Sequence, residues 1–211
     1  MFDLILFDLD GTLTDSIHPA LLAIQEMLAV LKYQHKTTDE IKQYVGFGEV
    51  PLVEGAIGTN NKKLVREAME VYLSIYKKKW LKNLPLYPNV KETLLHFNSK
   101  KMAIVSNKAS NLIEMILANH GIRNLFIRVY GGDNSPCLKP DPCVVKMLIA
   151  ETGIPKSNVL FVGDMAVDIK TAKRSGIKSC AVSYGFDPVE DLIREKPDFL
   201  INDFVKILDI V

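Results

Sequence analysis

Carboxylates follow directly after two short apolar segments of this sequence. Residues 4–7 are all apolar and are followed by Asp8 and Asp10. Residues 159–162 are also apolar and are followed, after one glycine, by Asp164. Such a run, closed by glycine and polar residues, is typical of a strand buried in a parallel sheet. Buried carboxylates must be paired, hydrogen-bonded or bound to metal. We therefore expect a divalent cation and a reactive carboxylate at the ends of these strands.

Side chains that suit phosphate binding occur in similar places. Ser106 and Asn107 follow the apolar run 102–105, and Lys139 lies in a loop rich in proline. Because the carboxyl ends of parallel strands lie at one edge of a sheet, these residues and Asp168 should meet the other carboxylates around one crevice. Clustered carboxylates suit Mg²⁺, and a lysine and a serine hydroxyl near a helix start suit a phosphate. Together these groups indicate phosphoryl transfer.

The elements that must position these residues change in kind along the chain. From residue 84 onward, strands alternate with helices of about ten residues, which indicates βαβ units and a parallel sheet. Between residues 15 and 83 the apolar residues recur mostly at helical spacing. We therefore predict a doubly wound parallel α/β core, formed by residues 1–14 and 84–211, with a helical cap domain inserted at residues 15–83. A last helix is predicted to begin at Asp203.

Composition narrows the class of protein. The chain has 211 residues, of which 48% are hydrophobic, enough for one large domain with an insertion. Lys and Arg number 26 and Asp and Glu number 25, so no basic excess argues for a nucleic-acid partner. No apolar stretch approaches the roughly 20 residues of a membrane helix. We expect a cytoplasmic monomer or homodimer that binds neither nucleic acid nor membrane.

The chain has three cysteines, Cys137, Cys143 and Cys180. Their number is odd and they have no metal-ligand spacing, so the simplest interpretation is reduced thiols in a cytosolic protein. Cys137 and Cys143 are near enough in sequence to pair, but the sequence does not favour this.

Taken together, the motifs resemble those of the haloacid dehalogenase-like phosphatases. The matching residues are Asp8-Leu9-Asp10-Gly11-Thr12, Ser106, Lys139, and Gly163-Asp164 with Asp168, in the family's order. The resemblance covers the whole chain, including the helical cap. The segments Tyr130-Gly131-Gly132-Asp133, Lys139-Pro140-Asp141-Pro142 and Ser183-Tyr184-Gly185 look most like the phosphoglycolate phosphatase branch. This resemblance implies a Mg²⁺-dependent hydrolase of a small phosphorylated metabolite, with 2-phosphoglycolate as the first candidate.

The resemblance also implies catalytic roles. Asp8 would attack phosphorus and form an aspartyl-phosphate, while Asp10 would protonate the leaving alcohol and then deprotonate the attacking water. Mg²⁺ would be held by the Asp8 carboxylate, the Asp10 backbone carbonyl and Asp164. Asp168 would support the metal's waters or Lys139.

Further residues are expected to contact the substrate or its phosphate. They are Ser106, Lys139, Gly11, Thr12, Asn107 and the cap residue Phe47. Gly11 allows a sharp turn, and Thr12 can hydrogen-bond to hold Asp10 in place. Phe47 lies in a Gly-Phe-Gly loop, where caps of this family present their specificity loop.

Other interpretations of these residues remain open. Asp8 with Asp10, or Ser106 with Asn107, could be ordinary turns or helix caps, and Lys139 could be a surface lysine. The scaffold could also serve a phosphomutase of the β-phosphoglucomutase type, a pyrophosphatase, or a phosphate sensor without turnover. Relatives of the mutase type usually carry a non-hydroxyl residue at position 12, so Thr12 favours hydrolysis. Asp10 has no evident use in a sensor.

Overall fold

The computed structural model describes residues 1–97 and 99–211. The chain forms two compact units, one of residues 1–15 and 85–211 and the other of residues 16–84. No helix in the described ranges is long and apolar enough to cross a membrane.

The first unit is built on a parallel β-sheet that has six strands within the described residues, in the order β3-β2-β1-β4-β5-β6. The strands are β1 (Leu4–Phe7), β2 (Lys101–Val105), β3 (Arg128–Tyr130), β4 (Val159–Gly163), β5 (Lys178–Val182) and β6 (Phe199–Ile201). The strand order reverses between β1 and β4, which is where doubly wound sheets bind ligands. The predicted parallel α/β fold is confirmed.

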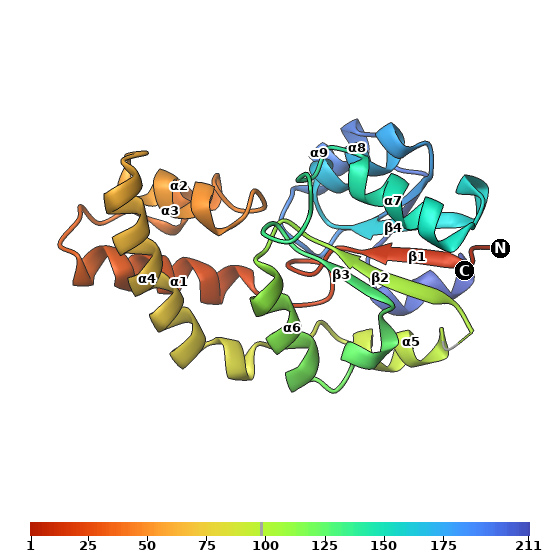
Figure 1. Ribbon diagram of the computed structural model, residues 1–211, viewed down its shortest axis with the longest axis horizontal. Helices are drawn as coiled ribbons and strands as arrows, with labels where there is room; N and C mark the ends of the chain where they lie inside the picture. The colour runs from red at the N-terminus through yellow and green to blue at the C-terminus, as the bar shows by residue number, and fades with distance from the viewer. Residues whose placement is uncertain (98) are drawn as a thin grey trace. The chain divides into compact units, whose positions relative to one another are not determined.

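Helices cover both faces of this sheet. Figure 1 shows α7 and α8 on one side and α5 and α6 on the other. The α-helices of this unit are α5 (Val90–His96), α6 (Ser110–Asn119), α7 (Cys143–Thr152), α8 (Ala166–Ser175) and α9 (Val189–Arg194). Short 3₁₀ turns are η2 (Arg123–Leu125), η3 (Lys156–Asn158) and η4 (Phe204–Asp209). The last helix predicted from Asp203 is present as η4, a 3₁₀ helix with Asp203 at its N-cap, which is the form that short segments often take.

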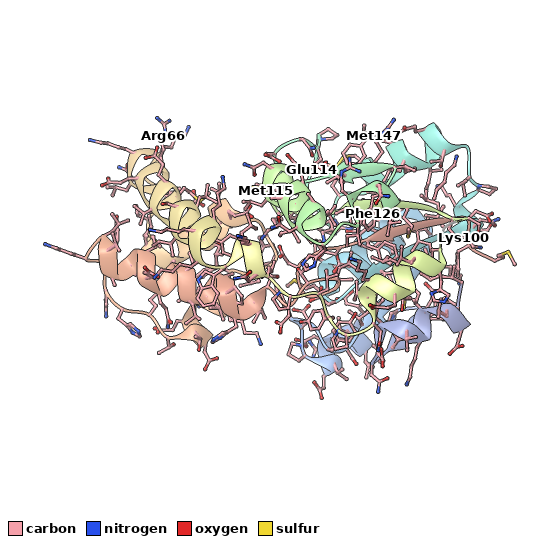
Figure 2. The ribbon with its side chains drawn as sticks, turned by 90° about the horizontal axis from the view of Figure 1, so that it is seen from below. Arg66, Lys100, Glu114, Met115, Phe126 and Met147 are labelled. Carbon is pink, nitrogen blue, oxygen red and sulfur yellow. A yellow bond between two sulfur atoms is a disulfide. The ribbon has the colours of Figure 1, made fainter. Side chains whose placement is uncertain are left out.

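The central strand β1 is apolar throughout because both its faces are covered. Leu4 and Leu6 pack in a cluster with Val144 of α7. Phe7 points to the opposite face, where its ring packs edge-on against Phe126, with centroids 6.3 Å apart. Phe126 is labelled in Figure 2. Burial on both faces explains why the first strand is an unbroken apolar run and not an alternating one.

The second unit is helical. Its elements are α1 (Ile17–Val30), α2 (Thr38–Lys42), α3 (Glu49–Ile57), α4 (Lys62–Lys79) and the 3₁₀ turn η1 (Leu81–Asn83). The Asn61 side chain accepts hydrogen bonds at the start of α4, and Thr37 forms a reciprocal capping box with Glu40 at the start of α2. Tyr72 and Tyr76 are buried and stacked one turn apart, with ring centroids 5.7 Å apart. These two tyrosines therefore serve the packing of α4.

The two chain segments that leave and re-enter the first unit are paired. Thr14 forms an antiparallel bridge with Leu86, and the amide of Asp15 donates to the carbonyl of Pro85 at 3.0 Å. The amide of Tyr87 donates to the carbonyl of Leu13 at 3.0 Å. The acidic turn after β1 is thus anchored on the side where the chain departs.

Candidate active site

Three carboxylates meet at the switch point of the sheet. Asp8 follows β1 and Asp164 follows β4, and these two strands are direct neighbours. Asp168 lies in the first turn of α8. All three residues are buried, and one carboxylate oxygen from each lies within 4.8 Å of the others. The expectation that the strand ends bring these side chains together is met by the geometry.

Lys139 is held between two of these carboxylates. Its Nζ lies 2.9 Å from Asp8 Oδ1 and 2.7 Å from Asp168 Oδ1. Burial alone would lower the pKa of this lysine, but the charges of Asp168 and Asp8 outweigh burial and raise the pKa above its ordinary value. The lysine therefore carries its charge in the buried site, and the interpretation as a surface lysine is wrong.

The crowded carboxylates hold protons more readily than isolated ones. Burial raises the pKa of Asp8 to about 6, because the nearby Lys139 only partly offsets it. Burial also raises the pKa of Asp164 well above its usual value, and the charges of Asp168 and Asp8 add to the effect. One lysine is not enough positive charge for this cluster, so the site favours a further cation or protons.

Asp164 is oriented by two hydrogen bonds. Its Oδ1 accepts from Thr12 Oγ1 at 2.7 Å, and its Oδ2 accepts from the Phe186 amide at 2.7 Å. The expectation that Thr12 holds Asp10 was wrong, because the Thr12 hydroxyl reaches across to the neighbouring strand end instead. Gly11 has a φ of +78°, and a Cβ there would collide with the Asp164 carboxylate. The turn after β1 therefore requires glycine at this position.

Asp10 lies at the more open side of the site, with 21% of its side chain exposed. Its Oδ2 is 3.1 Å from Nζ of Lys108, whose side chain is buried. Its Oδ1 is buried and has no hydrogen-bond partner among the described residues. Lys108 is a site residue that sequence reasoning missed. The sequence feature that could have identified Lys108 is its position directly after Ser106 and Asn107.

Asn107 ties the loop of Lys139 to the end of β2. Its Oδ1 accepts from the Lys139 amide at 2.9 Å, and its Nδ2 donates to the Lys139 carbonyl at 3.3 Å. Ser106 is buried beside it, and its Oγ accepts from the Lys108 amide at 3.4 Å. The amide of Asn107 thus positions Lys139, and phosphate binding by Ser106 or Asn107 stays a prediction.

Three other candidate residues have different surroundings. The Gly11 amide donates to the Thr14 carbonyl at 2.9 Å, and the Thr12 amide donates to the Leu9 carbonyl at 3.3 Å. Both amides are used to form the turn after β1, so phosphate binding by Gly11 and Thr12 stays a prediction. Phe47 belongs to the helical unit, where it lies between α2 and α3 with 48% of its surface exposed.

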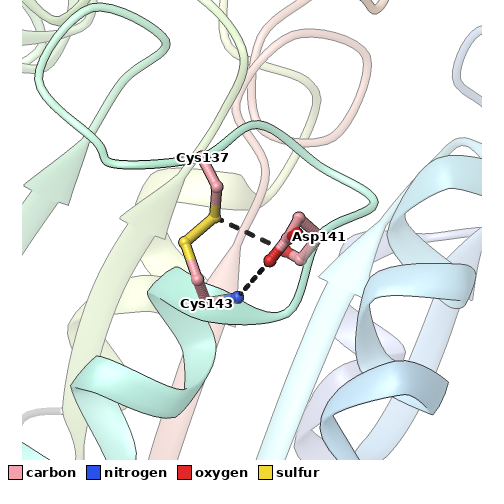
Figure 3. A group of neighbouring side chains, drawn as sticks. All are labelled: Cys137, Asp141 and Cys143. Atoms are coloured by element: carbon pink, nitrogen blue, oxygen red, sulfur yellow. Dashed lines mark hydrogen bonds between the residues drawn. A yellow bond between two sulfur atoms is a disulfide. The ribbon is translucent and has the colours of Figure 1, made fainter.

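The loop that carries Lys139 is closed by a disulfide between Cys137 and Cys143 (Figure 3). The expectation of reduced thiols is therefore wrong for this pair, although Cys180 is a free, buried thiol. The loop reverses direction where the Asp141 amide donates to the Leu138 carbonyl at 2.9 Å. This reversal brings the two Cα atoms to 6.4 Å, a separation that a disulfide can span.

Sheet and site together define an α/β enzyme with a buried acidic centre, and comparison with known proteins places it more closely. The sequence model of the haloacid dehalogenase-like hydrolases matches residues 5–182. The chain belongs to this family, as its motifs predicted.

Individual relatives point in the same direction. A phosphoglycolate phosphatase of Vibrio vulnificus is 34% identical over 217 residues, which cover 99% of this chain and 95% of the relative. A phosphoglycolate phosphatase of Pseudomonas savastanoi pv. phaseolicola is 32% identical, over 97% of this chain and 78% of the relative. The crystal structure of a predicted phosphoglycolate phosphatase from Haemophilus somnus superposes with a TM-score of 0.92 at 30% identity, covering 99% of this chain and 97% of that one. The chain is accordingly a hydrolase of phosphoric monoesters.

Proposed function

We propose that this protein is a Mg²⁺-dependent phosphatase that hydrolyses a small phosphorylated metabolite through an aspartyl-phosphate, with 2-phosphoglycolate as the first substrate to test. The observation that carries the proposal is the buried cluster of Asp8, Asp164 and Asp168 with Lys139 at the switch point. The names of the relatives in Vibrio and Pseudomonas support the choice of substrate.

The donor set fits Mg²⁺. The ligands offered are oxygens only, which is the preference of this ion, and carboxylate oxygens of Asp8, Asp164 and Asp168 lie within 4.8 Å of one another. The Asp8 carboxylate, the Asp10 backbone carbonyl and Asp164 would hold the ion. When bound, the ion supplies positive charge that offsets the repulsion between the carboxylates and the substrate's phosphate.

The chain's own residues supply the bond-making steps. An Asp8 carboxylate oxygen attacks phosphorus, and the ester bond breaks as Asp10 gives its proton to the leaving oxygen. Asp10 then takes a proton from a water molecule, which attacks the same phosphorus and breaks the bond to Asp8. Inorganic phosphate leaves, and both aspartates return to their starting states.

The remaining residues hold and neutralise the phosphoryl group. Lys139 already contacts Asp8 at 2.9 Å, so its ammonium lies where negative charge on the transferred group develops. Asp168 keeps that ammonium in place from the other side at 2.7 Å. Ser106 would add a hydroxyl donor from the end of β2.

The helical unit, expected from the sequence at residues 15–83, would act as a cap that limits water and selects the substrate. Phe47 is the residue of this unit that we propose contacts the substrate. The protein would work in the cytoplasm as a monomer or homodimer, without nucleic acid or membrane.

Replacing Asp8 by Asn tests the proposed nucleophile. Because an amide cannot form the aspartyl-phosphate, we expect kcat to fall by at least about 10⁴-fold with the circular dichroism spectrum unchanged. Release of inorganic phosphate from 2-phosphoglycolate is the measurement, with Mg²⁺ and with EDTA. Undiminished turnover in the variant would remove Asp8 from this role.

A substrate panel separates the proposal from its rivals. Glucose 1-phosphate tests a mutase and pyrophosphate tests a pyrophosphatase, and a protein that binds phosphate without turning over any compound would be a sensor. We expect kcat/KM to be highest for 2-phosphoglycolate. A higher value for pyrophosphate, or formation of glucose 6-phosphate, would favour the corresponding rival.

A further inference from the structure

The proposed mechanism gives no role to the buried ammonium of Lys108, which lies in the site. Lys108 is only 6% exposed, and its Nζ lies 3.1 Å from Oδ2 of Asp10. The phosphate clamp does not need this ammonium, because Lys139 already lies beside the nucleophile. A buried ammonium is costly unless it meets negative charge, so its position beside Asp10 calls for a function.

The backbone of Lys108 is fixed by the glycine-rich turn that follows β3. The amide of Gly132 donates to the Lys108 carbonyl at 2.8 Å, and Asp133 Oδ1 accepts from the amide of Ser110 at 2.7 Å. A Cβ at Gly132 would collide with the Asn107 carbonyl. The turn after β2 and the turn after β3 are therefore packed backbone to backbone. This packing fixes the position from which the Lys108 side chain extends.

The partner of Lys108 marks the side of the site on which the leaving group must lie. Asp10 gives its proton to the ester oxygen, so this oxygen comes within hydrogen-bond distance of the Asp10 carboxylate. In a phosphorylated 2-hydroxycarboxylate, the carboxylate carbon is only two bonds from the ester oxygen. A cation in contact with Asp10 is therefore placed to meet that carboxylate as well.

We infer that Lys108 binds the carboxylate of the leaving group and selects phosphomonoesters of 2-hydroxycarboxylates over uncharged alkyl phosphates. This inference rests on the proposed function and names the specificity residue of the same site. The Lys108 ammonium donates a charge-assisted hydrogen bond to the substrate carboxylate while it stays near Asp10. In this way the group that recognises the substrate lies next to the group that protonates it.

Two substrates that differ only at the carboxylate test the inference. The first is 2-phosphoglycolate, and the second is ethyl phosphate, in which a methyl group replaces the carboxylate. We expect the wild-type protein to prefer 2-phosphoglycolate in kcat/KM by about 100-fold, the size of one charge-assisted hydrogen bond. Lys108→Met should lose most of this preference, and Lys108→Arg should keep part of it.

Lys101, which is exposed at the start of β2, provides the matched control. Lys101→Met should leave both kcat/KM values and their ratio as in the wild type. If Lys108→Met lowers both substrates equally and keeps the ratio, the lysine only supports Asp10 and the inference is overturned.

The rates of the wild-type protein with the two substrates test the inference even if the Lys108 variants do not fold. A wild-type ratio below about tenfold, with both compounds hydrolysed, overturns the specificity role and leaves the phosphatase function standing. Hydrolysis of neither compound, nor of p-nitrophenyl phosphate with Mg²⁺, overturns the proposed function and with it this inference.

Discussion

The carboxylate of Asp8, the proposed nucleophile, is ionised in the folded protein only at an electrostatic cost. Its carboxylate is buried, and its nearest cation, Lys139, is shared with Asp168. The pKa of Asp8 is consequently raised to about 6. Keeping Asp8 ionised and ready to bind a cation or a phosphoryl group therefore lowers the stability of the ligand-free protein.

Replacing Asp8 by Asn should stabilise the metal-free protein at pH 7.5. A folded-state pKa of about 6, compared with 3.8 for the ordinary group, penalises the ionised folded state by up to about 3 kcal/mol. The penalty is complete above pH 6, shrinks as the pH falls toward 4 and is absent below that. Urea unfolding in EDTA between pH 4 and 8 measures the difference between variant and wild type.

Asp209, which is exposed, provides the control for this titration. Asp209→Asn should change the free energy of unfolding by less than about 0.5 kcal/mol. A destabilised Asp8→Asn protein at pH 7.5 would show that the ion pair with Lys139 outweighs the burial of the carboxylate.

At the scale of elements, the loop between β3 and α7 determines where Lys139 lies. The disulfide between Cys137 and Cys143 closes this loop around the lysine, and Asn107 fastens its backbone to the end of β2. The disulfide and the two hydrogen bonds from Asn107 together restrict the motion of Lys139, the cation that we propose binds phosphate. Less of its freedom is then lost when substrate binds.

Reduction of this disulfide should weaken both stability and phosphate binding. Opening a loop of this length costs about 2 kcal/mol in the chain-entropy account, so dithiothreitol should lower the urea midpoint and raise the inhibition constant of inorganic phosphate. The Cys137→Ser, Cys143→Ser double variant should match the reduced wild type and should not respond to dithiothreitol. Alkylation followed by mass measurement reports the state of the pair. An equal response of both proteins to the reductant would contradict the prediction.

Pattern reasoning located the strand ends but not the contacts between side chains. Asp8 and Asp164 could be placed together because neighbouring parallel strands bring their carboxyl ends to one edge. The hydrogen bond from Thr12 to Asp164 could not be predicted. The Thr12 hydroxyl lies in the turn after β1, and from the sequence it could face either Asp10 or Asp164. Lys108 was missed for a similar reason, since the sequence does not say to which side of the turn it points.

The disulfide was missed for a physical reason of a different kind. A spacing of six residues separates the thiols in an extended chain, and only the reversal closed at Asp141 brings them together. The prolines identified this stretch as a loop, but they did not indicate the direction in which the chain turns. Fold and acidic centre therefore followed from periodicity and topology, whereas the loop geometry required coordinates.

At the scale of the whole molecule, the strand order builds the site from residues that are far apart in the sequence. Asp8 and Asp164 are joined by a sheet whose neighbouring strands come from distant parts of the sequence. The acidic centre exists only when β1 and β4 are paired, so ligands of the centre bind the folded chain and not the unfolded one.

Mg²⁺ should therefore stabilise the folded protein by mass action. At a concentration 100 times the dissociation constant, the expected gain in the free energy of unfolding is about 2.7 kcal/mol, and EDTA should reverse it. Thermal unfolding followed by circular dichroism is the measurement. Asp164→Asn should remove most of the response, while Asp209→Asn should keep it. A response that survives in the Asp164 variant would place the ion elsewhere.

The bridge between Thr14 and Leu86 holds the two segments of the sheet unit together at the point where the helical unit is inserted. The bond from Asp15 to Pro85 ties the outgoing chain to the returning chain, so the spacing between them is set before the first helix begins. Insertions of quite different length or design can then be exchanged at this point without altering how β1 aligns with β2. If the helical unit selects the substrate, as we propose, replacing this one segment changes the substrate preference while Asp8 and Asp164 keep their positions at the ends of β1 and β4.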